Sequence, residues 1–122
     1  MSRRTKRVSK LLQETISEII LNDVSDPRLE FITITGVDVS PDLKHANVFY
    51  SILGDETERD DVKEAFESAG GYIQRLVTET IHLQYAPQVI FKYDNTLAKA
   101  QKMEELIEKT QSESENDSGE ID

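Results

Sequence analysis

Residues 31–53, which read FITITGVDVSPDLKHANVFYSIL, decide the fold of this chain. The segment 31–39 is rich in β-branched residues, which favour strands, but its alternation of apolar and polar side chains changes phase at Gly36. A β-bulge at Gly36 would turn the apolar residues on both sides of it toward one core. Turn-forming residues follow at 40–43, and apolar side chains alternate again over 46–52. The stretch therefore predicts an antiparallel β-hairpin.

An amphipathic helix is expected before the hairpin. From Val8 to Ile20, apolar side chains recur at intervals of three and four residues, enough for about four helical turns. The helix has to end before Asp26-Pro27, because proline lacks an N–H and biases the preceding residue toward extended geometry. Four basic residues lie outside the apolar stripe and should face solvent: Arg3, Lys6 and Lys10 opposite it, and Arg7 on its flank.

A second helical pattern follows an acidic loop, residues 54–61. Carboxylates ahead of a helix can accept hydrogen bonds from its free N–H groups and favour the positive end of its dipole, so this loop is expected to cap the helix in both ways. Apolar positions then keep one helical register from Val62 to Thr80, with Gly70 and Gly71 in the middle. Each glycine inside a helix costs about 1 kcal/mol relative to alanine. The pair therefore predicts two helices joined by a kink.

The chain ends with a third strand, a short helix and a polar tail. Residues 89–94 alternate as a strand, 95–108 suit a short helix, and 109–122 are mainly Ser, Glu, Asp and Asn and should be disordered. The predicted order, α-β-β-α-kink-α-β, belongs to the α+β class, with a three-stranded sheet covered on one face by helices. Residues 1–108 should form a single domain ahead of the acidic tail, residues 109–122.

The composition excludes several classes of function. The 122 residues suit one domain, and the absence of Cys removes disulfides, thiolate metal sites and Cys nucleophiles. Only His45 and His82 could supply imidazole, and no phosphate loop, zincin pair or nucleophile elbow is present. The acidic loop lacks the alternating ligands and central glycine of a calcium loop. We therefore expect no enzyme activity, no metal, no cofactor and no small-molecule substrate.

Membrane attachment is also not expected. The sequence has no run of about 18 apolar residues and no apolar core of a secretion signal at its N-terminus. We therefore expect a cytoplasmic protein that does not bind membranes.

The net charge of −10 conceals an uneven distribution. Residues 104–122 hold eight acids and one base, whereas residues 1–13 hold five bases and no acid. This polarity indicates an anionic partner at the N-terminal end. No aromatic residue lies among these bases, so contacts to a nucleic-acid backbone are expected rather than base stacking. Docking on an acidic protein, as in a small α+β protein-interaction module with a basic docking helix, is the alternative.

The glycine pair also allows two interpretations. Gly70 and Gly71 could let two helix halves pack at an angle or pass close to the sheet. Alternatively, backbone without side chains could let a phosphodiester chain approach the N–H groups that open the second helical segment, with Arg75 one turn further on.

Several motifs, in this order and spacing, together resemble the bacterial ribosome-binding factor A family over about residues 3–97. They are Arg7-Val8, Asp26-Pro27-Arg28, the run Ile34–Leu43 with Ala46-Asn47-Val48, Ala69-Gly70-Gly71, and Pro87 ahead of Phe91-Lys92-Tyr93-Asp94-Asn95. The resemblance implies a type-II KH-like domain. In that fold Ala69-Gly70-Gly71 would form a helical kink at the place where KH domains have a GXXG loop.

The resemblance also implies a function. A member of this family would be a non-catalytic ribosome assembly factor that binds the immature small (30S) subunit and precursor 16S rRNA and promotes late rRNA maturation, especially in the cold. We expect a monomer whose partners are 16S rRNA and the free 30S subunit. The candidate RNA-binding residues are Arg3, Arg4, Lys6, Arg7, Lys10, Arg28, Ala69, Gly70, Gly71, Gln74 and Arg75.

Overall fold

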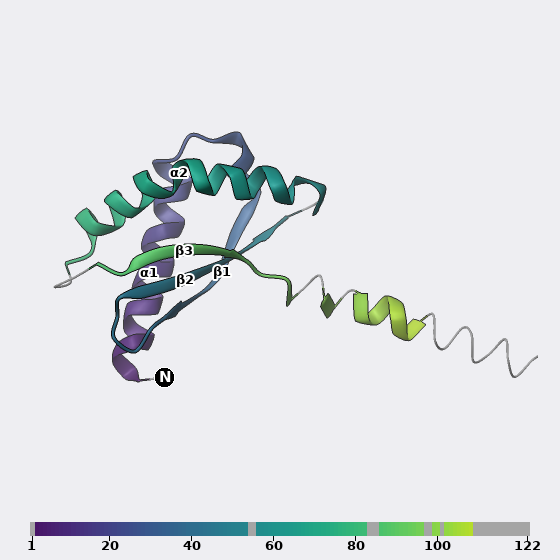
Figure 1. Ribbon diagram of the computed structural model, residues 1–122, viewed down its shortest axis with the longest axis horizontal. Coiled ribbons are helices and arrows are strands. Elements are labelled where there is room, and N and C mark those ends of the chain that lie inside the picture. The colour runs from purple at the N-terminus through teal and green to yellow at the C-terminus, as the bar shows by residue number, and fades with distance from the viewer. Residues whose placement is uncertain (1, 54–55, 83–85, 97–98, 101, 109–122) are drawn as a thin grey trace, which may run out of the picture.

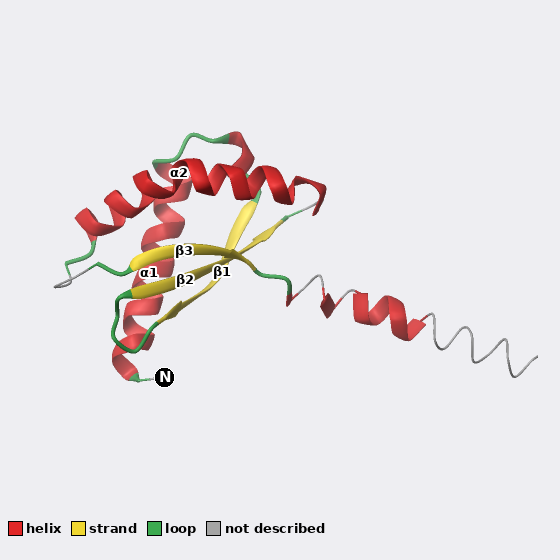
Figure 2. Cartoon of the chain, in the orientation of Figure 1, coloured by secondary structure: helices red, strands yellow, loops and turns green. Residues whose placement is uncertain are grey.

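A computed structural model of the chain describes residues 2–53, 56–82, 86–96, 99–100 and 102–108. Two long helices pack against a small sheet (Figures 1 and 2). The elements are α1 (Arg3–Asn22), β1 (Ile32–Val39), β2 (His45–Ile52), α2 (Arg59–Thr80) and β3 (Gln88–Tyr93), with 3₁₀ turns at Pro27–Leu29 and Glu56–Glu58. The predicted hairpin, first helix and third strand are thus confirmed.

The sheet has the strand order β1-β2-β3. β1 and β2 form the predicted antiparallel hairpin, and the register shifts between Ile34 and Gly36. This shift is the predicted β-bulge. It lets Ile34 and Val39 both be buried, although strict alternation would place them on opposite faces of the strand. β3 then pairs with β2 in parallel, from His45 opposite Gln88 to Tyr50 opposite Tyr93.

The core lies between one face of this sheet and the two helices. Leu12 and Ile16 of α1 and Ile73 and Val77 of α2 have no exposed surface, and they join Val48 of β2 in one cluster. The intervening residues of the strands face the other way and are exposed or half-buried. The prediction of a three-stranded sheet covered on one face by helices is therefore confirmed.

The prediction of two separate helices around the glycine pair is wrong. α2 is one α-helix of 22 residues that runs through Gly70 and Gly71 without interruption. Buried residues lie on both sides of the pair, Phe66 before it and Ile73 after it, and both belong to the same core cluster. Burying such side chains contributes about 1.5–3 kcal/mol each, which exceeds the helix-propensity cost of the two glycines.

The start of α2 also differs from the expectation. Glu58, the residue before the helix, makes no side-chain hydrogen bond to the free N–H groups at the start of α2. Asp60 and Asp61 instead lie in the first turn, where their charges complement the positive end of the helix dipole. Among the described residues, Asp60 and Asp61 therefore support the start of α2 through charge, and Glu58 does not cap it by a hydrogen bond.

The C-terminal part agrees with the expected helix where it is described. Residues 96, 99–100 and 102–108 are helical, and the side chains of residues 102–108 are exposed. The predicted disordered tail, residues 109–122, lies outside the described residues.

Candidate nucleic-acid interface

Five basic residues cover the outer side of the first turns of α1, and we call them the basic head: Arg3, Arg4, Lys6, Arg7 and Lys10. All five are exposed, whereas Thr5, Val8 and Ser9 between them are buried. At about 100° per residue, the five side chains spread over roughly 160° of the helix circumference, opposite the buried stripe. The basic head therefore presents a broad cationic surface to solvent.

The basic head sits at the positive end of its own helix. Ser2 caps α1, because its hydroxyl oxygen accepts a 3.2 Å hydrogen bond from the Thr5 backbone N–H. The first turn contains no acidic residue and instead carries Arg3 and Arg4. Bases at this end of a helix oppose its dipole and cost stability, about 0.3–1 kcal/mol each. Charges placed against the dipole are explained best by an anionic ligand.

The cations of the basic head have no internal ion-pair partner. In the described part of the chain, Arg28 is the only base that forms ion pairs, with Asp26 and Glu64. An unpaired surface cation keeps its full attraction for an external anion, because no intramolecular contact has to break first. The geometry of the basic head therefore suits phosphate binding.

The β-hairpin adds one cation, Lys44, and one further polar side chain, His45, that the sequence did not indicate. The turn between β1 and β2 lies at the same end of the molecule as the start of α1 (Figure 1). Lys44 in this turn and His45 at the start of β2 are both exposed. Their nearness to the basic head arises from the packing of α1 against β1, which no local sequence signal reveals.

The glycine pair faces open space. A Cβ atom added to Gly70 or Gly71 would meet no atom within 4 Å, and neither residue has a backbone conformation that excludes other amino acids. A close approach of the glycines to the sheet is therefore ruled out. Ala69 differs, because it is half-buried and packs against the core.

An aromatic residue beside the glycines was missed by the sequence reasoning. Tyr72 is 42% exposed, and the guanidinium of Arg75 lies 5.3 Å from its ring centre. A flat ring with a cation over it, next to backbone without side chains, can stack on a nucleic-acid base. The spacing of Tyr72 and Arg75, three residues apart on a helix, was the available signal. We call Gly71, Tyr72 and Arg75 the glycine surface, whereas Gly70 lies two residues from Tyr72 and faces another side of α2.

The structure does not bring the basic head and the glycine surface together. α1 runs from its N-terminal end, at the bottom of Figure 1, toward α2 at the top. The basic head therefore lies at the end of α1 that is remote from α2. The two surfaces could contact one ligand only if that ligand extends along the domain, as a folded RNA does.

The side chains of two other predicted site residues form hydrogen bonds within the chain. The Arg28 guanidinium donates to both carboxylate oxygens of Asp26, the shortest contact being 2.8 Å, and this side-chain bond holds the pKa of Asp26 below its usual value. Gln74 donates to the Pro87 carbonyl at 3.0 Å and accepts from the Val89 N–H at 2.7 Å. The amide of Gln74 thus joins α2 to the start of β3.

In the part of the chain that the structure describes, no three His, Asp or Glu side chains are placed to hold a metal ion. Among the same residues, no helix is long and apolar enough to cross a membrane.

Comparison with known proteins agrees with the fold. The sequence model of the family described as Ribosome-binding factor A matches residues 4–107. A protein named Ribosome-binding factor A from Halothermothrix orenii is 45% identical over 114 residues, which is 93% of each chain. The solution structure of a Thermotoga maritima protein assigned to ribosome binding factor A superimposes with a TM-score of 0.66 at 29% identity, covering 75% of this chain and 88% of that chain.

A further similar structure is a ribosome binding factor A of Thermus thermophilus, fitted as a homology model into a cryo-EM map of a 30S complex. Its TM-score is 0.59 at 20% identity, covering 70% of this chain and 90% of that chain. These neighbours have a KH-like fold, so the KH-like α+β architecture implied by the resemblance is confirmed.

Proposed function

This chain belongs to the ribosome-binding factor A family, and from that premise we propose that it binds the free small ribosomal subunit through 16S rRNA. The basic head would supply the main contacts, by pairing with backbone phosphates. The Thermus thermophilus relative, fitted into a map of a 30S complex, supports the small subunit as the partner.

The observation that carries this proposal is the position of the basic head. Five exposed and unpaired bases occupy the first turns of α1, and the helix dipole disfavours the two in the first turn, Arg3 and Arg4. Bound phosphates would offset this loss of stability, because their oxygens accept hydrogen bonds from Arg and Lys side chains and their negative charge is favoured at the positive end of a helix. An acidic protein could use the same charges, but it would not explain the glycine surface, whose flat ring and bare backbone suit RNA.

The proposal includes the role of the bound protein. We infer that the chain acts as a monomer in the cytoplasm, holds precursor 16S rRNA during late maturation and is needed most in the cold. Cold strengthens misfolded RNA pairings, so a binder that favours the correct arrangement has most effect at low temperature. The role requires binding and no catalysis by this chain.

Co-sedimentation tests the proposal. The purified chain is mixed with free small subunits, large subunits or intact ribosomes and centrifuged through a sucrose cushion. We expect it to travel with the small subunits and to be displaced by added 16S rRNA but not by an acidic protein. Equal recovery with all three particles, or displacement by the acidic protein alone, would contradict the proposal.

A further inference from the structure

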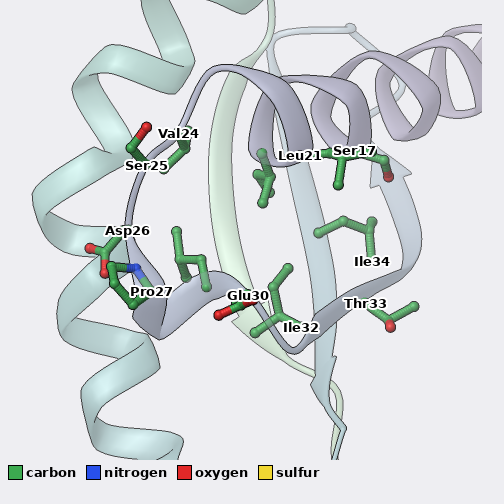
Figure 3. A pocket seen from close by; sticks show the side chains of 12 residues that line it. Ser17, Leu21, Val24, Ser25, Asp26, Pro27, Glu30, Ile32, Thr33 and Ile34 are labelled. Atoms are coloured by element: carbon green, nitrogen blue, oxygen red, sulfur yellow. The ribbon is translucent and has the colours of Figure 1, made fainter.

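A second surface lies at the opposite end of α1 from the basic head. A groove of about 610 Å³ opens between the C-terminal half of α1, the segment 24–30 and the start of β1 (Figure 3). Leu21 of α1 and Ile32 of β1 approach the same space in Figure 3, and Ile20, Val24, Leu29 and Ile34 complete its apolar lining. The groove is therefore a preformed apolar site outside the proposed RNA surface.

Apolar surface continues beyond the groove. Leu21 is 82% exposed at its edge, Phe31 is 57% exposed next to Ile32, and Leu53 is 62% exposed. Phe31 and Leu53 are neighbours, because the Leu53 N–H donates to the Phe31 carbonyl at 2.8 Å. A small molecule would fill only the groove, whereas an extended ligand could cover the exposed side chains as well.

The groove has an acidic rim, which we define as Glu14, Glu18, Asp23, Asp26 and Glu30. Asp26 and Glu30 line the groove directly, and Glu14 and Glu18 each lie three helical residues from a lining residue of α1. No base occurs between Leu11 and Pro27. The one base that follows, Arg28, is bound to Asp26. The rim is therefore negative although the other end of the same helix is positive.

The negative charge of the acidic rim indicates which kind of ligand the groove binds. An acidic rim repels RNA, so the groove is not an extension of the RNA surface. The chain's own C-terminal helix fits the rim poorly as well, because its three acids, Glu104, Glu105 and Glu108, outnumber its two described bases, Lys99 and Lys102. We propose that the groove docks a positively charged segment of a partner protein, which inserts large apolar side chains between α1 and β1 while its Lys or Arg side chains pair with the acidic rim. The protein would then bind RNA at one end of α1 and a basic protein segment at the other.

A pair of synthetic peptides tests this assignment. The first is a short amphipathic helix of Leu and Lys, and the second has every Leu replaced by Ser so that only the charge remains. Each is titrated into the full-length ¹⁵N-labelled chain, and amide shifts and the dissociation constant are followed by NMR. We expect the Leu-Lys peptide to shift the amides of residues 17–34 and to bind more tightly than the Ser-Lys peptide.

Matched variants distinguish binding in the groove from non-specific attraction of a basic peptide to an acidic protein. Leu21→Ser should weaken the Leu-Lys peptide about tenfold, because the variant removes a large apolar side chain from the edge of the groove. Leu11→Ser removes an exposed leucine of the same helix, distant from the groove, and should leave affinity unchanged. Glu30→Lys should weaken binding about threefold or more, whereas Glu79→Lys at the far end of α2 should have little effect.

Other outcomes would overturn the assignment. If Leu21→Ser and Leu11→Ser behave alike, or if the shifts spread over the acidic residues of α2, the groove is not the docking site. If Leu21→Ser dissociates a homodimer in sedimentation equilibrium, the occupant is a second copy. If deleting residues 102–122 shifts the groove amides, the occupant is the chain's own helix. None of these results would bear on binding of small subunits by the basic head, which is measured separately.

Discussion

The side-chain oxygen of Gln74 in α2 accepts a 2.7 Å hydrogen bond from the backbone N–H of Val89 in β3. The same amide donates to the Pro87 carbonyl at 3.0 Å. β3 is an edge strand whose other side pairs with β2, so Gln74 satisfies a backbone group that the sheet leaves free. The Gln74 side chain therefore adds a polar link between α2 and the edge of the sheet to the apolar packing of the helix.

Replacing Gln74 separates a structural role from an RNA-binding role. Gln74→Ala should lower the free energy of unfolding by about 1–3 kcal/mol, because a partly buried N–H loses its acceptor. Gln74→Glu keeps an acceptor for Val89 but places a carboxylate oxygen against the Pro87 carbonyl, so it should also destabilise the fold at neutral pH and recover stability as the carboxyl protonates. Subunit affinity should stay at the wild-type value for both variants at temperatures where they are folded. A loss of affinity without a loss of stability would restore Gln74 to the RNA-binding set.

The glycine pair gives a second prediction. Gly70→Ala and Gly71→Ala should each raise the free energy of unfolding by up to about 1 kcal/mol, because an added methyl meets no neighbour and helix propensity improves. Gly71→Ala should also weaken subunit binding, since the methyl projects into the space that a nucleic-acid chain would use.

Ser68→Ala is the matched control for that experiment. It improves helix propensity on the same exposed helix without adding bulk at the glycines, so it should raise stability and leave subunit affinity unchanged. Wild-type affinity in Gly71→Ala would show that the glycine surface does not contact RNA, and would leave the basic head as the only proposed interface.

Some features of the fold depend only on neighbouring residues, whereas others depend on contacts between distant segments. The helical stripe of α1 and the phase change at Gly36 are set by neighbouring residues, and both were predicted correctly. The continuity of α2 through the glycines depends on burial of Phe66 and Ile73 in one core, which propensity alone does not register. The parallel pairing of β3 with β2 and the bond from Gln74 to Val89 join distant segments, so no sequence period reports them.

The candidate site also has features that the local sequence predicts and others that only the folded structure shows. The outward direction of the basic head followed from helical periodicity and is confirmed. The engagement of Arg28 by Asp26 could have been anticipated from their spacing of two residues across a proline, but the sequence reasoning took Arg28 as free for RNA. Tyr72 lies outside the N-terminal cluster of bases, and its pairing with Arg75 depends on the helical geometry of α2. The groove between α1 and β1 needs the folded arrangement and has no signal in the sequence.

The pH dependence of stability should carry a contribution from Asp94. Hydrogen bonds from Thr96 and from the Thr35 hydroxyl, the latter at 2.7 Å, hold the pKa of this carboxyl below 3.8. The unfolded chain therefore binds a proton at a higher pH than the folded chain does. The contribution is fully present above the ordinary pKa and is lost as the pH falls through the lowered one.

Two variants check this assignment. Asp94→Asn should flatten the fall in melting temperature between about pH 5 and pH 2, because the titrating group is gone. Thr35→Val should raise the pKa of Asp94 toward its ordinary value in an NMR titration. An unchanged acid limb in Asp94→Asn would mean that this hydrogen-bonded carboxylate contributes nothing to acid stability.

The acidic tail gives a prediction based on charge alone. Residues 110–122 contain five acids and no base, and such a charge competes with RNA for the basic head at low ionic strength. Deleting them should tighten binding of 16S rRNA at low salt, and the difference should fade as salt shortens the screening length. A tail of equal length with Gln and Asn in place of the acids should act like the deletion. If the neutral tail behaves like wild type, charge is not the cause.

The central claim is that the basic head of α1 binds rRNA phosphates, and the salt dependence of subunit affinity in Lys6→Glu/Lys10→Glu tests it most directly. Both lysines are exposed, and acids are favoured near the start of a helix, so the variant should melt at the same or a slightly higher temperature than wild type. The matched control is Lys63→Glu/Lys92→Glu, which makes the same charge change on α2 and β3. Removing one lysine–phosphate ion pair should reduce the slope of log affinity against log salt by about 0.7–0.9. We predict weaker binding and a shallower slope for the Lys6/Lys10 variant and a near wild-type slope for the control. An unchanged affinity and slope in the Lys6/Lys10 variant, or an equal loss in both variants, would contradict the account.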